Sequence, residues 1–165
     1  MTVGEVKSWL ESYTDTLRKI FRAEEALKEA RERATSIGAK LGDGMPRAHG
    51  AKTDLSDHVV RVYELAQRAA TLDARAEAIA DGICDELGWA DLTQIEMRVI
   101  IERYLRPERV VVTSGKIDRR DGYKMREWSK IAQKLKISED RVYKAHGKAL
   151  GKIADSRTRW ERGLA

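Results

Sequence analysis

The first third of the chain carries an apolar repeat that only a long helix can use. After Val6, apolar residues recur at intervals of three, four or seven, and Glu24 stands where one position is skipped: Leu10, Tyr13, Leu17, Ile20, Leu27, Ala30, Ala34 and Ile37. Side chains at these intervals line one stripe of an α-helix, and a stripe that repeats every seven residues packs against another helix. The sequence therefore predicts a long helix with a coiled-coil-like seam.

A second seam follows a glycine-rich interruption. Residues 38–53 hold four glycines and one proline, which disfavour helix and predict a mobile loop. Beyond it, Asp54 or Ser56 can cap a helix with apolar residues at intervals of three, four or their sum: Val59, Val62, Ala66, Ala69, Ala76, Ala80, Ile83 and Leu87. The two helices can fold back into an antiparallel hairpin. A homodimer that exchanges helices through this hairpin fits the pattern equally well, and a plain spacer is the remaining alternative.

A third helix is expected after Thr93, because Thr93 and Glu96 have the spacing of a capping box, and Trp89 and Leu92 can pack onto its first turn. Pro107 ends this helix. Residues 109–125, with three valines in succession and two glycines, are the least helical part of the chain and predict a short β-ribbon or an exposed basic loop. Five cations in or next to this region could contact a phosphate backbone: Lys116, Arg119, Arg120, Lys124 and Arg126. A disordered surface loop is the alternative.

The charge is divided unevenly along the chain. Residues 1–105 hold 15 basic and 19 acidic side chains, a net charge of −4, whereas residues 106–165 hold 17 and 8, a net charge of +9. A concentrated positive field favours a polyanion, because each neutralised phosphate releases counterions. Nucleic acid is therefore the first candidate partner, and a solvated basic surface without a partner is the alternative.

The segment from Trp128 to Gly147 has the layout of a helix-turn-helix. One short helix is expected to turn Ile131, Ala132 and Leu135 inward, followed by a turn at Lys136 and Ile137. Ser138 is placed to cap the next helix, whose inward residues are Val142, Ala145, Ala149, Leu150 and Ile153. The same spacing leaves four side chains pointing outward, where a major groove would lie: Arg141, Tyr143, Lys144 and Lys148.

This segment resembles region four of bacterial sigma factors and the related helix-turn-helix regulators. The matching residues are Ile131, Ala132, Leu135, Ser138, Arg141, Val142, Ala149 and Leu150, and residues 97–104 look like the helix that precedes the motif in that family. With the long hairpin, its glycine-rich loop and residues 56–63, the whole chain is similar to the small phage-encoded, sigma-factor-like regulators of the ArpU type. The resemblance implies a DNA-binding transcriptional regulator of phage or prophage origin.

The chain departs from the family pattern at two places. Lys136 stands where the family usually has glycine in the turn, and a left-handed conformation there costs about 1 kcal/mol. The stretch of residues 106–127 is also longer than the short connection expected before the motif. It either carries an added DNA contact or shifts the register of the first motif helix.

Arg141 is the best candidate for a bidentate contact to guanine, and Lys144 can reach a guanine edge or a phosphate. Tyr143 can touch a thymine methyl group or a phosphate. The alternatives are a surface ion pair of Arg141 with Glu139 or Glu127, and packing of Tyr143 on the neighbouring helix. We expect His146 to be a half-buried packing residue. The remaining candidate DNA-binding residues are Ser138, Glu139, Lys148, Lys130, Lys134, Arg126, Lys116, Arg119 and Arg120, of which the lysines and arginines contact phosphates.

Several classes of protein are not expected. The longest uncharged stretches have six residues, too few to cross a bilayer, and residues 1–10 carry charges that disfavour a secretory signal, so the expected compartment is the cytoplasm. Cys84 is the single cysteine and the three histidines are scattered, so we expect no disulfide, metal site or cofactor. Neither Gly115-Lys116 nor Gly147-Lys148 is followed by Ser or Thr, and Cys84 has no nearby His, so no enzyme is expected.

The sequence therefore predicts an all-α protein with two parts. Residues 1–88 form a long antiparallel helical hairpin, and residues 89–165 form a helix-turn-helix domain that binds double-stranded DNA and regulates transcription. Two rivals keep the fold. One is a small terminase-like subunit that assembles into a ring for DNA packaging, and the other is an adaptor that docks on RNA polymerase without reading DNA.

Overall fold

A computed structural model describes residues 1–41, 55–110 and 122–161. Its helices are α1 (Val3–Leu41), α2 (Leu55–Trp89), α3 (Gln94–Ile100), α4 (Trp128–Leu135) and α5 (Glu139–Glu161), with a wide π-helical turn, η1 (Ile101–Leu105), directly after α3. The two strands are β1 (Glu108–Arg109) and β2 (Tyr123–Lys124). The chain is all-α with a minimal β-ribbon, as the sequence predicts. Among the described residues, none of the helices is long and apolar enough to cross a membrane.

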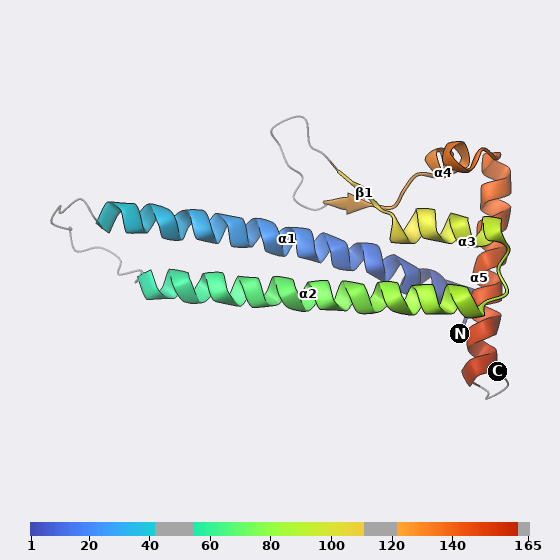
Figure 1. The fold of residues 1–165 in the computed structure, drawn as a ribbon, viewed down its shortest axis with the longest axis horizontal. Helices are drawn as coiled ribbons and strands as arrows, with labels where there is room; N and C mark the ends of the chain where they lie inside the picture. The colour runs from blue at the N-terminus through green and yellow to red at the C-terminus, as the bar shows by residue number, and fades with distance from the viewer. Residues whose placement is uncertain (42–54, 111–121, 162–165) are drawn as a thin grey trace.

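The two longest helices, α1 and α2, form the predicted antiparallel hairpin (Figure 1). Its seam contains Val6, Ile20, Ala69, Ile83 and Leu87, all buried. The register differs from the prediction at two points. Ala23 is buried where the sequence suggested a position occupied by Glu24, and Val59 is 58% exposed while Leu65 lies in the seam. Intervals of three and four fit more than one phase of the repeat, and the phase that is buried runs through Thr16, Ile20 and Ala23 on α1 and through Leu65 and Ala69 on α2. The prediction of a loop over residues 38–53 is wrong at its start, because residues 38–41 continue helix α1; residues 42–53 lie outside the described residues.

The long helix α5 runs across the base of the hairpin and joins it to the helix-turn-helix (Figure 1). Its residues Leu150 and Ile153 share one hydrophobic core with Leu10 of α1, Ile83 of α2 and Tyr104 of η1. Val142 and Ala145, two turns earlier on α5, belong instead to a second core with α3 and α4. A single helix therefore serves both cores, and apolar packing continues across the predicted boundary at residues 88 and 89.

The C-terminal half of α5 is fastened to the end of α2 and to α1. Trp160 stacks on Trp89 with ring centroids 5.3 Å apart, a contact that the sequence does not predict. The Arg157 Nε donates a hydrogen bond of 3.0 Å to the buried Glu86 carboxylate, and the Arg157 guanidinium lies over the ring of Trp9. These contacts fix the direction in which α5 leaves the hairpin.

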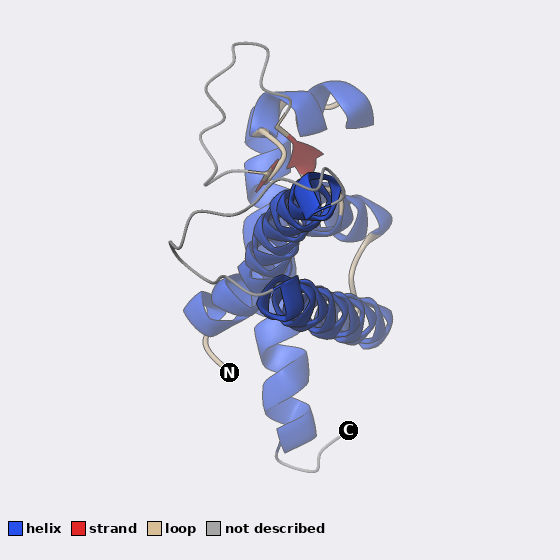
Figure 2. Cartoon of the chain, turned by 90° about the vertical axis from the view of Figure 1, so that its left-hand side faces the viewer, coloured by secondary structure: helices blue, strands red, loops and turns tan. Residues whose placement is uncertain are grey.

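The β-ribbon pairs Glu108 with Lys124 and Arg109 with Tyr123 in antiparallel register, and it lies beside α1 when the hairpin is viewed end-on (Figure 2). A Cβ atom at Gly122 would overlap the ring of Phe21, so only glycine lets the ribbon approach α1 this closely. Arg18 of α1 donates a hydrogen bond of 2.8 Å to the Tyr123 carbonyl oxygen. The foot of the predicted basic loop is thus docked on the hairpin.

Candidate nucleic-acid interface

Helices α4 and α5 form the predicted helix-turn-helix, and its turn has the geometry that the sequence requires. Lys136 adopts φ 55° and ψ 44°, the left-handed conformation expected where the family has glycine. The Ile137 amide then donates to the Ala132 carbonyl oxygen at 3.1 Å, which closes the end of α4. Ser138 caps α5 as predicted, because its Oγ accepts a hydrogen bond of 3.3 Å from the Arg141 amide.

A small three-helix core holds the motif rigid. Val99 of α3, Ile131 and Ala132 of α4, and Val142 and Ala145 of α5 are all buried against one another. The capping box of α3 is present in both directions: the Thr93 amide donates to Glu96 at 2.8 Å, and the Glu96 amide donates to the Thr93 hydroxyl at 3.4 Å. The inward residues of the motif are therefore those that the sequence predicted.

Trp128, at the first position of α4, is the centre of an aromatic cluster on the motif. Its ring lies 5.0 Å from that of Tyr143 and 4.8 Å from that of His146, and the Arg103 guanidinium sits 4.2 Å from its centroid. Burial lowers the pKa of Arg103. Because these residues come from η1, α4 and α5, the cluster fixes the orientation of α4 on α5.

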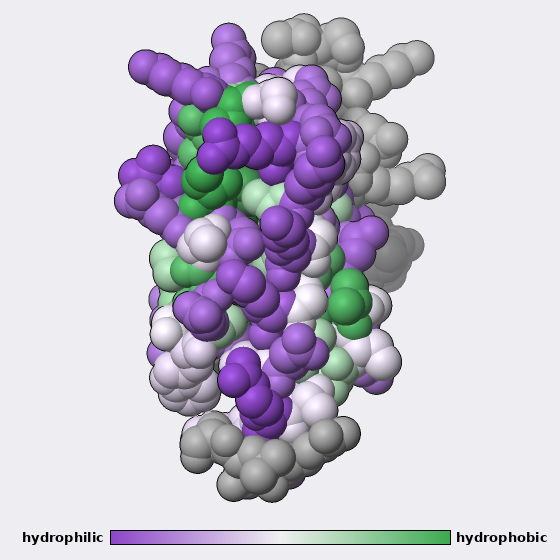
Figure 3. Space-filling model, turned by 90° about the vertical axis from the view of Figure 1, so that its right-hand side faces the viewer, coloured by the Kyte–Doolittle hydropathy of each residue, from purple (hydrophilic) through white to green (hydrophobic). Residues whose placement is uncertain are grey.

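The outward side of α5 presents the residues predicted to face DNA. Arg141, Tyr143, Lys144 and Lys148 are all exposed, as are Ser138 and Glu139. Tyr143 packs on the ring of Trp128 of the neighbouring helix, which is the alternative expected for it, and remains 49% exposed. Seen from the side of α5, hydrophilic side chains dominate the surface and apolar ones show only as separate patches (Figure 3).

The two basic residues nearest the N-terminus of α5 differ in their surroundings. The Lys144 Nζ lies 2.7 Å from an oxygen of Asp140, one turn earlier, and this hydrogen bond raises the pKa of Lys144. The guanidinium of Arg141 forms no ion pair within residues 1–41, 55–110 and 122–161; Glu127, one of its predicted alternatives, pairs with Lys124 at 2.9 Å. Arg141 is thus more available to a ligand than Lys144.

The predicted phosphate contacts on the first motif helix are engaged with carboxylates. Lys134 lies 2.8 Å from Glu102, Lys130 lies 2.7 Å from Glu108, and Arg126 pairs with both of these glutamates. Sequence reasoning missed these partners because they stand 18 to 32 residues earlier in the chain, beyond the reach of helical spacing. The other predicted contacts, Lys116, Arg119 and Arg120, lie outside the described residues.

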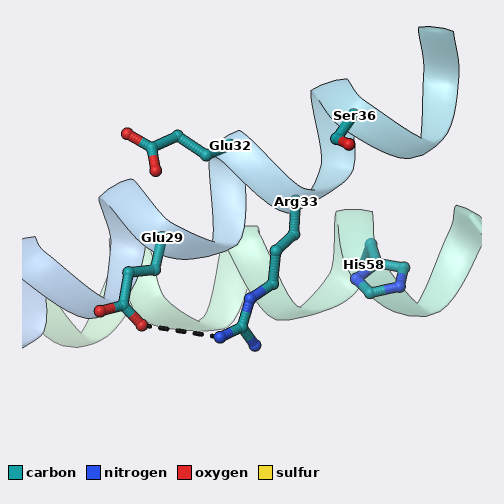
Figure 4. A pocket seen from close by; sticks show the side chains of 5 residues that line it. All are labelled: Glu29, Glu32, Arg33, Ser36 and His58. Carbon is teal, nitrogen blue, oxygen red and sulfur yellow. Dashed lines mark ion pairs between the residues drawn. The ribbon is translucent and has the colours of Figure 1, made fainter.

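Within the described residues, one hollow lies on the hairpin, far from this face. It is a shallow, open space between the distal ends of α1 and α2, lined by Glu29, Glu32, Arg33, Ser36 and His58 (Figure 4). Glu29 and Arg33 form an ion pair across one turn at 3.7 Å. Within the part of the chain that the structure describes, no group of three or more His, Cys, Asp or Glu side chains could hold a metal ion.

Comparison of the chain with protein-family models, with curated proteins and with solved structures gives no match in any of the three. The geometry of α4 and α5 therefore carries the functional argument.

Proposed function

We propose that this protein is a sequence-specific, double-stranded DNA-binding regulator of transcription, with a helix-turn-helix like that of sigma factor region four. One observation carries the proposal: α5 holds Arg141, Tyr143, Lys144 and Lys148 outward while its opposite side is locked into two hydrophobic cores. A helix of this kind fits the major groove, and its first turns contact base edges. A chain of the ArpU type, encoded by a phage or prophage and acting in the cytoplasm, is the specific form of this proposal.

Arg141 carries the sequence information in this mechanism. Its guanidinium can donate two parallel hydrogen bonds to O6 and N7 of one guanine, a contact worth about 1–3 kcal/mol of discrimination against a wrong base. Lys144 lies one turn from Asp140 and reaches a guanine edge or a phosphate. Tyr143, held against Trp128, touches a thymine methyl group or a phosphate.

The length of α5 explains how the reading end is supported. Its 23 residues span about 35 Å, of which only the first turns enter the groove. The remainder of α5 packs on the hairpin. The position of Arg141 is therefore fixed by a buried hydrophobic core, without a flexible linker between them. A homodimer through the hairpin would place two such helices on a palindromic site.

The proposal is tested by selecting bound duplexes from a random pool at a stated salt concentration. We compare the native chain with an Arg141→Ala, Lys144→Ala double variant, and use a Lys19→Gln, Lys28→Gln variant on α1 as a control that also removes two exposed cations. Enrichment of one motif by the native and control chains, lost in the double variant, supports the proposal. Enrichment that is absent or unchanged in the double variant overturns it.

The native chain and the double variant also distinguish the two alternative functions, a DNA-packaging subunit and an RNA polymerase adaptor. A ring of many subunits in solution favours a packaging component similar to a small terminase subunit, whereas a monomer or dimer fits a regulator. Binding to RNA polymerase that persists after Arg141 and Lys144 are neutralised favours an adaptor.

A further inference from the structure

We propose that a two-layered charge cluster beside α4 is a phosphate platform, on which a buried carboxylate, Glu102, and a partly buried one, Glu108, hold three cations in place for the backbone of duplex DNA. The inference rests on the proposed function and adds to it a residue, Arg106, and a positioning role for Glu102 and Glu108. The cluster draws on η1, the β-ribbon and α4, which are far apart in the sequence.

The inner layer consists of Glu102, Glu108 and Arg126. The side chain of Glu102 is only 6% exposed, and those of Glu108 and Arg126 are both 20% exposed. Arg126 bridges the two carboxylates: one of its terminal nitrogens pairs with Glu102, and its Nε lies 3.6 Å from Glu108. A carboxylate as buried as that of Glu102 is strongly destabilising unless cations and hydrogen bonds compensate its charge, so cations are held close to it.

The outer layer consists of Arg106, Lys130 and Lys134. Arg106 Nη1 lies 3.0 Å from Glu102, Lys134 lies 2.8 Å from the same carboxylate, and Lys130 lies 2.7 Å from Glu108. Between 46% and 59% of each of these side chains remains exposed, so each cation touches a carboxylate on one side and solvent on the other.

The charges do not cancel. Four cations against two carboxylates leave a net charge of +2, concentrated on the outer layer. Free lysine and arginine side chains lose rotamer freedom when a ligand orders them, and the carboxylates impose much of that order in advance. In a helix-turn-helix, the second helix lies in the major groove and the first helix crosses the DNA backbone. Lys130 and Lys134 belong to the first helix, α4, and would therefore lie beside the backbone phosphates.

Salt dependence measures the platform directly. Each phosphate contact contributes about 0.9 to the slope of log affinity against log salt concentration. We therefore expect the Arg106→Gln, Lys130→Gln variant to lower that slope by about two, measured by fluorescence anisotropy with a labelled duplex over a series of KCl concentrations. The Lys19→Gln, Lys28→Gln variant has the same change of net charge on the hairpin and should keep the native slope, since salt screens distant charges.

Neutralising Glu102 shows whether this carboxylate positions the platform cations or only repels the DNA phosphates. Glu102→Gln raises the net charge by one, so a carboxylate that only competed with DNA would, when removed, give tighter binding. A positioning role predicts the opposite: weaker binding, by roughly three-fold or more, with a flatter salt dependence, since two of the three platform cations lose their anchor. Glu108→Gln, at the less buried carboxylate, gives the same test if circular dichroism shows that Glu102→Gln fails to fold.

The outcomes are distinct. An unchanged salt slope for the Arg106 and Lys130 variant, in a native chain whose binding depends on Arg141, overturns the platform and leaves the proposed function standing. Tighter binding of both glutamate variants overturns the positioning role. A native chain whose duplex binding does not depend on Arg141 overturns the proposed function and this inference with it.

Discussion

The hydroxyl of Tyr104 lies 2.8 Å from Nε2 of His146, so this contact connects the π-helical turn η1 to the N-terminal half of α5. The two rings also stack, with centroids 5.8 Å apart. Burial raises the pKa of Tyr104 to about 12. Burial, together with Arg103 and Lys7, lowers the pKa of His146 to about 4. At neutral pH both groups are therefore uncharged, and the tyrosine hydroxyl can donate its hydrogen to Nε2.

This pair predicts a loss of stability in mild acid. The pKa of His146 is about 4 in the folded chain and about 6.5 when unfolded, so between these values the unfolded state binds more protons. Stability from the neutral imidazole is complete above pH 6.5 and is lost as the pH falls towards 4. We expect a loss of about 2 kcal/mol, a value reduced because the ring is partly exposed.

Urea unfolding across this pH range measures the effect, with His146→Gln as the matched control. Glutamine can still form a hydrogen bond with Tyr104 but does not titrate. The native chain should lose about 2 kcal/mol more than the variant between pH 7.5 and pH 4.5. Parallel profiles for the two chains would show that His146 is not the source of the pH dependence.

The left-handed turn residue offers a stabilising substitution. Lys136→Gly should raise the free energy of unfolding by about 1 kcal/mol, because glycine adopts φ 55° without steric cost. Lys136→Ala keeps the strained Cβ and should give no gain. Equal stabilities for the glycine and alanine variants, measured by urea unfolding, would contradict the assignment of strain to this turn.

The Glu86–Arg157 pair predicts an asymmetric response to mutation. The Glu86 side chain is 8% exposed and that of Arg157 is 31% exposed. If Arg157 is removed, the charge of Glu86 stays buried without its partner, whereas Arg157 without Glu86 can turn towards water. Arg157→Ala should cost about 3 kcal/mol, and also loses the contact with Trp9. Glu86→Leu should cost much less, because it leaves no buried charge without a partner and Arg157 can turn towards water. Thermal unfolding of both single variants gives the comparison, and similar losses would refute the argument.

Asp140 should restrain DNA binding. Its carboxylate holds Lys144 at 2.7 Å and adds a negative charge at the start of α5. We expect Asp140→Asn to bind the selected duplex more tightly, by up to about ten-fold, with most of the gain lost at high salt. Anisotropy titrations at two salt concentrations measure this. Weaker binding by the variant would instead make Asp140 part of the DNA-contacting set.

The elements that the sequence predicted well are those with local signals. The turn at Lys136, the Ser138 cap and the inward residues of α4 and α5 depend on spacings of three or four residues, and all are present. The hairpin seam was predicted in outline but misplaced at Glu24 and Val59, because apolar residues fit more than one phase of the three-four repeat.

What the sequence did not predict depends on contacts between distant segments. The π-helical form of η1 has no spacing signature, yet it brings Glu102, Arg103 and Tyr104, three successive residues, to three different parts of the motif. Helical spacing gives no sign that Glu86, Glu96 and Glu102 are buried, because cations from other elements of the fold pair with these carboxylates. The ion pairs of Lys130 and Lys134 were unpredictable for the same reason.

The central claim is that α5 reads bases through Arg141. A double-mutant cycle between this side chain and the N7 atom of a guanine tests it most directly. In the selected site, each guanine is replaced in turn by 7-deazaguanine, which lacks the N7 acceptor. The account predicts that, at one guanine, the replacement weakens binding of the native chain by about 1–3 kcal/mol and leaves binding of Arg141→Ala unchanged. Equal losses for the native and Arg141→Ala chains at every guanine would contradict it.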